Sequence, residues 1–315
     1  MKNIKIVTYH YIRPIKGSKF PRIKGLEFYN FKKQLDYLQS NHTILDYSSF
    51  IKILKTKNIQ NNRKYCILTF DDGYKDHIKY VLPELKKRNL KGFFFPPSII
   101  FSKKDLLNVN KVHFLLEKNI NPDKIKKKIF ALIKNNKLFN KKKYSEKHIS
   151  KIEKKFVNKD RFDNKEISFL KFLFQTHFTE KQSNILVGQL FKTFLNIDQK
   201  KFFSELYMNK IDLKKMIKSG MYVGGHGCNH VRFKNLSKNK LNKEIKLTLK
   251  FLKSIKAPTK DWIMCYPFGS FNINSIKILK KKDSICAFTT NKGLVDIKKD
   301  NYFKLNRLDT NDIKI

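Results

Sequence analysis

Two adjacent carboxylates, Asp71 and Asp72, are the side chains best suited to chemistry in the first third of the chain. They follow an apolar run at 65–68 and precede Gly73, in the stretch TFDDG. Neighbouring side chains on a strand point to opposite faces, so we expect the pair at a strand end or in the following turn, where glycine lets the backbone bend. Such a pair suits a metal ligand beside a proton-transfer base, although a solvated Asp-Asp-Gly turn fits these residues equally well.

A pair of histidines, His226 and His230, is the second polar feature. They lie four residues apart after Gly224-Gly225. This spacing is expected to bring both imidazoles to one side of a helical turn, and histidine is the commonest ligand for zinc and similar metals. A polar loop with chance spacing is the alternative. One carboxylate and two histidines would make a three-ligand set with open positions for water and substrate.

The elements that must position these residues alternate between strand and helix on both sides of a long central segment. Apolar runs predict strands, apolar residues at helical spacing predict helices, and their alternation favours a parallel sheet or barrel. The expected strands are 3–10, 65–70, 92–95, 221–225, 261–266, 285–289 and 303–308, and the main helices are 28–38, 75–89, 238–255 and 273–279. Asp46 or Ser48 could cap a further short helix, and Ser237 could cap the helix from 238.

The central segment, residues 111–207, is rich in lysine and poor in glycine. Its apolar residues recur at helical spacing, and no strand–helix alternation is visible. We therefore expect one α/β domain made of residues 1–110 and 208–315, with a helical insertion at 111–207.

The composition is strongly basic, with 69 Lys+Arg against 26 Asp+Glu and a net charge of +43. Such a charge can indicate nucleic acid or an anionic surface as a partner. Because the excess is mostly lysine spread along the whole chain, an AT-rich coding bias explains it as well, and no specific nucleic acid is expected. The charge could still assist binding to anionic glycans or to a membrane surface.

The four cysteines and the first residues bear on the compartment. None of the cysteines forms a CxxC pair, which predicts buried free thiols in a reducing compartment. The N-terminus does not resemble a signal peptide, and no apolar run approaches the ~20 residues of a membrane span. These features predict a cytoplasmic protein, with the inner membrane surface as an alternative location.

Three motifs in order carry a resemblance to a known family. TFDDG at 69–73, HGCNH at 226–230 and YPFG at 266–269 together resemble the polysaccharide deacetylases, the NodB-homology or carbohydrate esterase family 4 group. The resemblance covers residues 1–110 and 208–312. It implies a distorted (β/α) barrel of about seven strands, with the active site at the C-terminal ends of the strands.

The resemblance also implies roles for individual residues. Asp71 would be the general base, and Asp72, His226 and His230 would hold a divalent metal, usually zinc. The metal would bind the acetamide carbonyl oxygen and a water, and Asp71 would take a proton from that water. The backbone at Tyr266 and Pro267 would contact the substrate and help to stabilise the oxyanion.

The chain departs from the family pattern in three places. No histidine follows His230, so His10 is the candidate general acid, as in relatives with an early Tyr-His motif. Cys265 occupies the position where the family often has an arginine that pairs with the base, and Arg307 could supply that positive charge instead. Gly227 replaces the usual Ser or Thr after the first metal histidine.

These observations predict a hydrolase of non-peptide C–N bonds that removes N-acetyl, less readily O-acetyl, groups from a saccharide. The substrate would be a polysaccharide, or a glycolipid or sugar intermediate of surface-glycan synthesis. Two alternatives remain open at this point. One is a catalytically degenerate glycan- or nucleic-acid-binding protein on the same fold, and the other is a hydrolase of another C–N bond, such as a cyclic amide.

Overall fold

A computed structural model describes residues 4–60, 62–158, 161 and 163–313. The chain folds into two compact units. One unit is formed by the described residues within 1–16, 25–105 and 200–315, and the other by those within 17–24 and 106–199. The short segment 17–24 therefore groups with the helical residues, which its Pro- and Gly-containing loop sequence does not predict.

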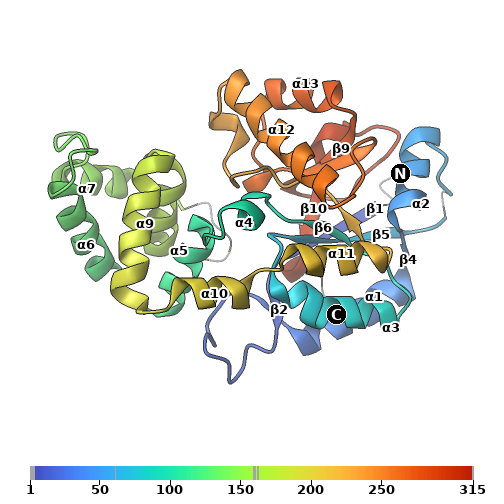
Figure 1. Ribbon diagram of the computed structural model, residues 1–315, viewed down its shortest axis with the longest axis horizontal. Helices are drawn as coiled ribbons and strands as arrows, with labels where there is room; N and C mark the ends of the chain where they lie inside the picture. The colour runs from blue at the N-terminus through green and yellow to red at the C-terminus, as the bar shows by residue number, and fades with distance from the viewer. Residues whose placement is uncertain (1–3, 61, 159–160, 162, 314–315) are drawn as a thin grey trace. The chain divides into compact units, whose positions relative to one another are not determined.

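The first unit is built on seven parallel strands in the order β7-β6-β5-β1-β10-β9-β8 (Figure 1). Their bounds are β1 (Ile4–Tyr9), β5 (Tyr65–Asp71), β6 (Phe93–Phe95), β7 (Tyr222–Val223), β8 (Trp262–Cys265), β9 (Ser284–Lys292) and β10 (Leu305–Asp309). A short strand, β4 (Thr43–Ile44), adds to β5, and β2 (Ile12–Arg13) pairs with β3 (Leu26–Glu27) in a separate two-stranded sheet.

The two outer strands of this order are joined by hydrogen bonds beyond the end of β7. The Gly225 N–H donates to the Ile263 carbonyl at 3.0 Å, and the Cys265 N–H donates to the Gly225 carbonyl at 2.7 Å. Because β7 and β8 are the first and last strands of this order, these hydrogen bonds bring the two edges of the sheet together and give it the form of a barrel. The expected distorted barrel of about seven strands is confirmed.

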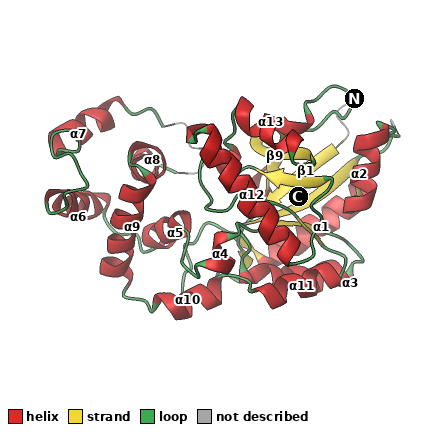
Figure 2. Ribbon diagram, turned by 45° about the horizontal axis from the view of Figure 1, so that its top comes forward, coloured by secondary structure: helices red, strands yellow, loops and turns green. Residues whose placement is uncertain are grey.

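Helices cover the outside of the barrel (Figure 2). They are α1 (Phe28–Asn41), α2 (Tyr47–Thr56), α3 (Leu82–Lys87), α4 (Ile99–Ser102), α11 (Lys210–Lys218), α12 (Lys238–Ser254) and α13 (Ile273–Lys281), with 3-10 turns η3 (Phe233–Asn235), η4 (Pro267–Gly269), η5 (Tyr302–Lys304) and η6 (Thr310–Asp312). Asp46 caps α2 and Ser237 caps α12, as the sequence predicts. The helix expected at 75–89 is present from residue 75 to residue 87, and it includes a π-helical turn, η1 (His77–Val81), directly before α3.

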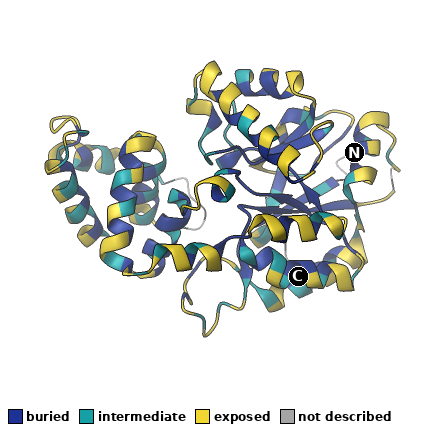
Figure 3. Cartoon of the chain, viewed as in Figure 1, coloured by how far each residue is buried: buried dark blue, intermediate teal, exposed yellow. Residues whose placement is uncertain are grey.

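Successive strand residues belong to two different hydrophobic clusters, because neighbouring side chains point to opposite faces of the sheet. One cluster contains Ile6, Ile67 and Phe93, and the other contains Val7, Leu68 and Phe94. Both faces of the strands are therefore buried, as Figure 3 shows by the dark colour of the barrel strands. This pattern explains why the strands read as continuous apolar runs.

The second unit is helical. Its elements are α5 (Asn108–Glu117), α6 (Pro122–Lys134), α7 (Glu146–Lys155), α8 (Lys165–Phe172), the π-helical turn η2 (Leu173–His177), α9 (Glu180–Leu195) and the first residue of α10 (Gln199–Leu206). Both α5 and α6 pack against α9, which begins with a capping box made by Thr179 and Gln182. Within the part of the chain that the structure describes, no helix has the length and apolar character that a membrane crossing requires.

Candidate metal centre and active site

The register of the strands determines which side chains meet at the C-terminal end of the barrel. Ile67 lies on the same face of β5 as Asp71, and Leu305 lies on the same face of β10 as Arg307; both apolar residues belong to one cluster. Because every second side chain of a strand points to the same face, Asp71 and Arg307 lie on the face that carries this cluster, at the C-terminal ends of their strands. β1 places His10 there in the same manner, since it pairs with both β5 and β10.

Asp72 leaves the strand in a left-handed backbone conformation, with φ of +68°. Its N–H donates to the Phe95 carbonyl at 3.0 Å. Gly73 follows at φ +70°, and a Cβ at this position would lie 2.8 Å from the Cβ of Pro96. This tight turn requires glycine, and it lets the two adjacent carboxylates make different contacts.

Asp72, His226 and His230 converge on one point. The Asp72 Oδ1 atom lies 3.4 Å from Nε2 of His226 and 3.2 Å from Nε2 of His230. Asp72 and His226 are buried, and no described residue hydrogen-bonds to Asp72 Oδ1. A buried carboxylate oxygen without a partner, facing two imidazole nitrogens, is the donor set that a divalent cation needs, so these three residues fit a metal site.

The charge state of this group also suits a cation. Burial disfavours the charge of Asp72, but the proximity of His230 and His226 outweighs burial and holds the pKa of Asp72 well below its usual range. The carboxyl group is therefore ionised. The Tyr74 hydroxyl donates to its other oxygen, Oδ2, at 2.6 Å. Burial and the neighbouring Asp72 charge raise the pKa of Tyr74 well above its usual value, so the hydroxyl remains protonated.

The histidines lie in an irregular loop. The residues of the 226–230 segment have no helical structure, and Gly227 and His230 have φ values of +69° and +52°. The expectation of a helical turn is therefore wrong, and the loop conformation brings the imidazoles together instead. The left-handed conformation at residue 227 also gives a physical reason for glycine in place of Ser or Thr.

A hydrogen bond fixes the orientation of His226. Its Nδ1–H donates to the Cys265 carbonyl at 2.7 Å, because a carbonyl can only accept. In the neutral form of the ring, the lone pair is therefore on Nε2, the atom that faces Asp72. Such a bond from the other ring nitrogen is typical of metal-binding histidines.

Glu244 of α12 holds the histidine loop in place through hydrogen bonds. Its buried carboxylate accepts the N–H groups of Cys228 and Asn229, each at 2.9 Å, and a side-chain N–H of Asn229. The sequence analysis did not identify this residue. The available signal was an acidic side chain beside Leu241 and Ile245 on the inward face of an otherwise amphipathic helix.

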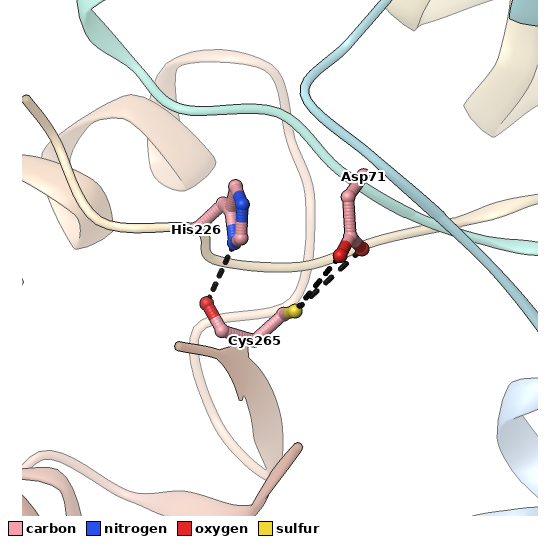
Figure 4. Close-up of side chains that lie close together, drawn as sticks. All are labelled: Asp71, His226 and Cys265. Atoms are coloured by element: carbon pink, nitrogen blue, oxygen red, sulfur yellow. Dashed lines mark hydrogen bonds between the residues drawn. The ribbon is translucent and has the colours of Figure 1, made fainter. Parts of the chain in front are cut away.

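A second cluster, Asp71, His226 and Cys265, also lies within ligand distance of one centre (Figure 4). This cluster is a poorer metal site for two reasons. Both oxygens of Asp71 already accept hydrogen bonds from the Arg307 guanidinium, whose charge would repel a cation. Burial raises the pKa of the Cys265 thiol, so a metal at this cluster would have to displace its proton. The thiol instead donates to Asp71 at 3.4–3.5 Å.

Arg307 holds Asp71 through a buried, two-pronged ion pair. Its two terminal nitrogens donate to Oδ1 at 3.1 Å and to Oδ2 at 2.8 Å, and the Arg307 side chain is only 1% exposed. Further donations reach the Thr289 carbonyl and the Thr69 hydroxyl. Burial alone would raise the pKa of Asp71, but the Arg307 charge outweighs burial and lowers it to about 2.

His10 lies beside this ion pair and faces solvent. Its Nε2 is 3.9 Å from Oδ2 of Asp71, and its side chain is 44% exposed. A hydrogen bond fixes the backbone of His10: the Nε2–H of the fully buried His77 donates to the His10 carbonyl at 2.9 Å. The sequence analysis gave no role to His77.

Tyr266 and Pro267 lie at the end of β8 and are buried. The Tyr266 N–H donates to the Phe288 carbonyl at 3.0 Å, so it is engaged in the sheet, and proline has no N–H to offer. The next residue, Phe268, places its ring 4.7 Å from the ring of His230 in an edge-to-face contact.

Comparisons with known proteins agree with this architecture. The family model described as "Polysaccharide deacetylase" matches residues 58–110 and 184–284, which include both Asp71-Asp72 and the histidine loop. No curated protein matches the sequence significantly.

Solved structures with the same fold cover 97% of this chain. The Streptococcus pyogenes deacetylase PplD in complex with acetate is 15% identical with a TM-score of 0.57, and 91% of its chain is covered. IcaB from Ammonifex degensii is 14% identical with a TM-score of 0.56 and 91% covered. A de-N-acetylase from Aggregatibacter actinomycetemcomitans is 14% identical with a TM-score of 0.51 and 94% covered. With that family model matching its sequence and this fold shared with the solved structures, the chain belongs to the polysaccharide deacetylase family.

Proposed function

We propose that this protein is a metal-dependent hydrolase that removes N-acetyl groups from a saccharide. The observation that carries the proposal is the convergence of Asp72, His226 and His230 around a carboxylate oxygen to which no residue that the structure describes hydrogen-bonds, next to the buried and ionised Asp71. One carboxylate is thus available as a ligand and the other as a base.

Asp72 Oδ1, His226 Nε2 and His230 Nε2 are the proposed ligands, and zinc is the proposed metal. A bound divalent ion would polarise the acetamide carbonyl and lower the pKa of a water molecule towards ~7. The hydrogen bond from His226 Nδ1 to Cys265 orients its ring for this task, and Glu244 holds the loop that carries both histidines.

Asp71 is the proposed general base, which accepts a proton from the attacking water. It is ionised because Arg307 lowers its pKa, and both of its oxygens are oriented by the guanidinium. In this proposal Arg307 performs the function that the family often gives to an arginine at the position of Cys265. The thiol of Cys265 adds a weak hydrogen bond to the same carboxylate.

His10 is the proposed general acid, which donates a proton to the leaving amine. Its side chain is exposed enough to meet a bound substrate and lies 3.9 Å from the base. The His77 hydrogen bond to the His10 backbone supports this position.

An acetylated saccharide is the proposed substrate, either a polysaccharide or a glycolipid or sugar intermediate of surface-glycan synthesis. Two of the proteins that share this fold are a deacetylase and a de-N-acetylase, which supports the reaction class. The net charge of +43 would assist binding to a substrate presented on an anionic glycan or a membrane surface. Residues 1–110 and 208–315 are the proposed catalytic domain, and residues 111–207 the proposed insertion.

The test is release of acetate by Zn²⁺-loaded protein from a panel of free, lipid-linked and nucleotide-linked N-acetyl sugars. We expect Asp71→Asn to lower the rate by a factor of about 10²–10⁴, because it removes the base but keeps the metal ligands. Failure to release acetate from any member of the panel, with Asp71→Asn indistinguishable from the wild type, would refute the proposal. Metal binding without acetate release would favour another C–N bond as the target, and no metal binding would favour a binding protein.

A further inference from the structure

Tyr74 contacts the proposed metal ligand Asp72 through Oδ2, the carboxylate oxygen other than the one that faces the histidines. Its hydroxyl donates to Asp72 Oδ2 at 2.6 Å, and the side chain is fully buried. No other described residue donates a hydrogen bond to Oδ2. The two oxygens of Asp72 therefore have different surroundings, since Oδ1 faces the imidazoles of His226 and His230.

The ring of Tyr74 is held on several sides. It stacks on Tyr11 at a centroid distance of 4.1 Å and lies parallel to Tyr207 at 6.1 Å. His77 meets it edge to face at 5.7 Å, and the Tyr74 carbonyl accepts the His77 N–H at 3.0 Å. A ring packed in this way has few alternative rotamers, so the position of its hydroxyl oxygen is set before any metal binds.

We propose that Tyr74 is a positioning residue that makes Asp72 a one-oxygen metal ligand through Oδ1. The inference rests on the proposed function, because it presupposes a metal held by Asp72, His226 and His230. By occupying Oδ2, the hydroxyl prevents the carboxylate from rotating and from presenting both oxygens to the cation. It also satisfies an oxygen that would otherwise be buried without a donor.

Removing the hydroxyl should therefore weaken metal binding without touching a ligand. Partners that hydrogen-bond to a metal ligand typically contribute about 10–100-fold to metal affinity. Tyr74→Phe keeps the ring and its stacking, and deletes only the donor. We expect its Zn²⁺ dissociation constant to rise by this factor.

Tyr9 offers a matched control. It is also a fully buried tyrosine, and its ring stacks on Phe70 at 5.3 Å. Within the described part of the chain its hydroxyl has no hydrogen-bond partner. Tyr9→Phe therefore removes a buried hydroxyl from the same barrel without changing the contacts of Asp72, and should leave the Zn²⁺ affinity unchanged.

The experiment is a competition titration of the whole chain with Zn²⁺ and a chromophoric chelator, for wild type, Tyr74→Phe and Tyr9→Phe. Circular dichroism first establishes whether each metal-free variant is folded. A variant that is unfolded without metal is titrated by following its refolding with Zn²⁺, and linkage to the unfolding free energy then gives the same constant.

The outcomes separate this inference from the function on which it rests. Weaker binding by Tyr74→Phe alone supports it. Equal affinity of the three proteins for Zn²⁺ overturns the role of Tyr74 and leaves the metal centre standing, and an equal loss in both variants overturns it as well. A wild type that binds no Zn²⁺ overturns the proposed function itself.

Discussion

The buried ion pair between Arg307 and Asp71 makes a quantitative prediction about stability. Asp71 has a folded-state pKa of about 2, below the value of about 3.9 expected for an unfolded chain. This depression corresponds to roughly 2–3 kcal/mol of stability at neutral pH. Since the pKa is depressed on folding, this contribution is present above about pH 4 and is lost as the pH falls towards 2.

Arg307→Met removes the charge but keeps much of the apolar stem. It leaves the Asp71 carboxylate buried without its main partner, a change that typically costs about 3–5 kcal/mol. We expect that loss in the free energy of unfolding at pH 7, measured by urea denaturation. Without the guanidinium, burial dominates and raises the pKa of Asp71 above its usual value. A raised pKa favours the folded state at low pH, so the difference from wild type should shrink between pH 7 and pH 4.

A double-mutant cycle separates the pair from its surroundings. Arg307→Met and Asp71→Asn are combined, and the double variant should be more stable than the sum of the single losses predicts, by about 1–3 kcal/mol. The control is the exposed pair of Lys55 and Asp261, whose atoms lie 2.6 Å apart but whose lysine side chain is 52% exposed. Lys55→Met should cost less than about 1 kcal/mol. Additive losses in the cycle, or a loss for Arg307→Met that does not depend on pH, would refute the reasoning.

Three further perturbations test the surroundings of the site. Glu244→Gln should weaken Zn²⁺ binding about 10–100-fold, because the loop amides lose a charged acceptor; an unchanged constant in chelator competition would contradict this. Burial lowers the pKa of His77 to about 4, so the protein should lose about 2 kcal/mol of stability between pH 7 and pH 5 from this residue, and thermal unfolding of His77→Gln should lack that loss. Gly73→Ala should destabilise by about 1–3 kcal/mol because of its positive φ and the contact with Pro96, whereas Gly188→Ala in α9, where a Cβ meets nothing within 4 Å, should be neutral or stabilising.

The sequence predicted the barrel well because its strands are apolar on both faces and its helices are not. It could not predict which polar side chain faces which side. That assignment depends on the barrel register and on the left-handed backbone at Asp72, a property of two residues in a turn. Likewise, His226 and His230 were expected on a helical turn, but an irregular loop held by Glu244 brings them together.

The contacts that hold the site residues in place were the hardest to predict from the sequence. Arg307 reaches Asp71 across 236 residues, a placement that the sequence analysis expected only through the resemblance to a family with an arginine beside its base. Tyr74 and His77 follow Asp72 closely in the chain; in the fold Tyr74 donates to Asp72 Oδ2, and His77, the first residue of the π-helical turn, bonds to the His10 carbonyl. A tyrosine and a histidine after an acidic pair have no spacing rule that would reveal these contacts.

The most direct test of the metal centre is the ratio of bound Zn²⁺ to protein after loading and desalting. We predict about one Zn²⁺ per chain for the wild type and for Asp71→Asn, because Asp71 is the proposed base and not a ligand. Asp72→Asn and His230→Gln should each retain far less, because each removes one of the three proposed ligands. A wild type without zinc, or Asp72→Asn and His230→Gln variants that retain it fully, would contradict the account.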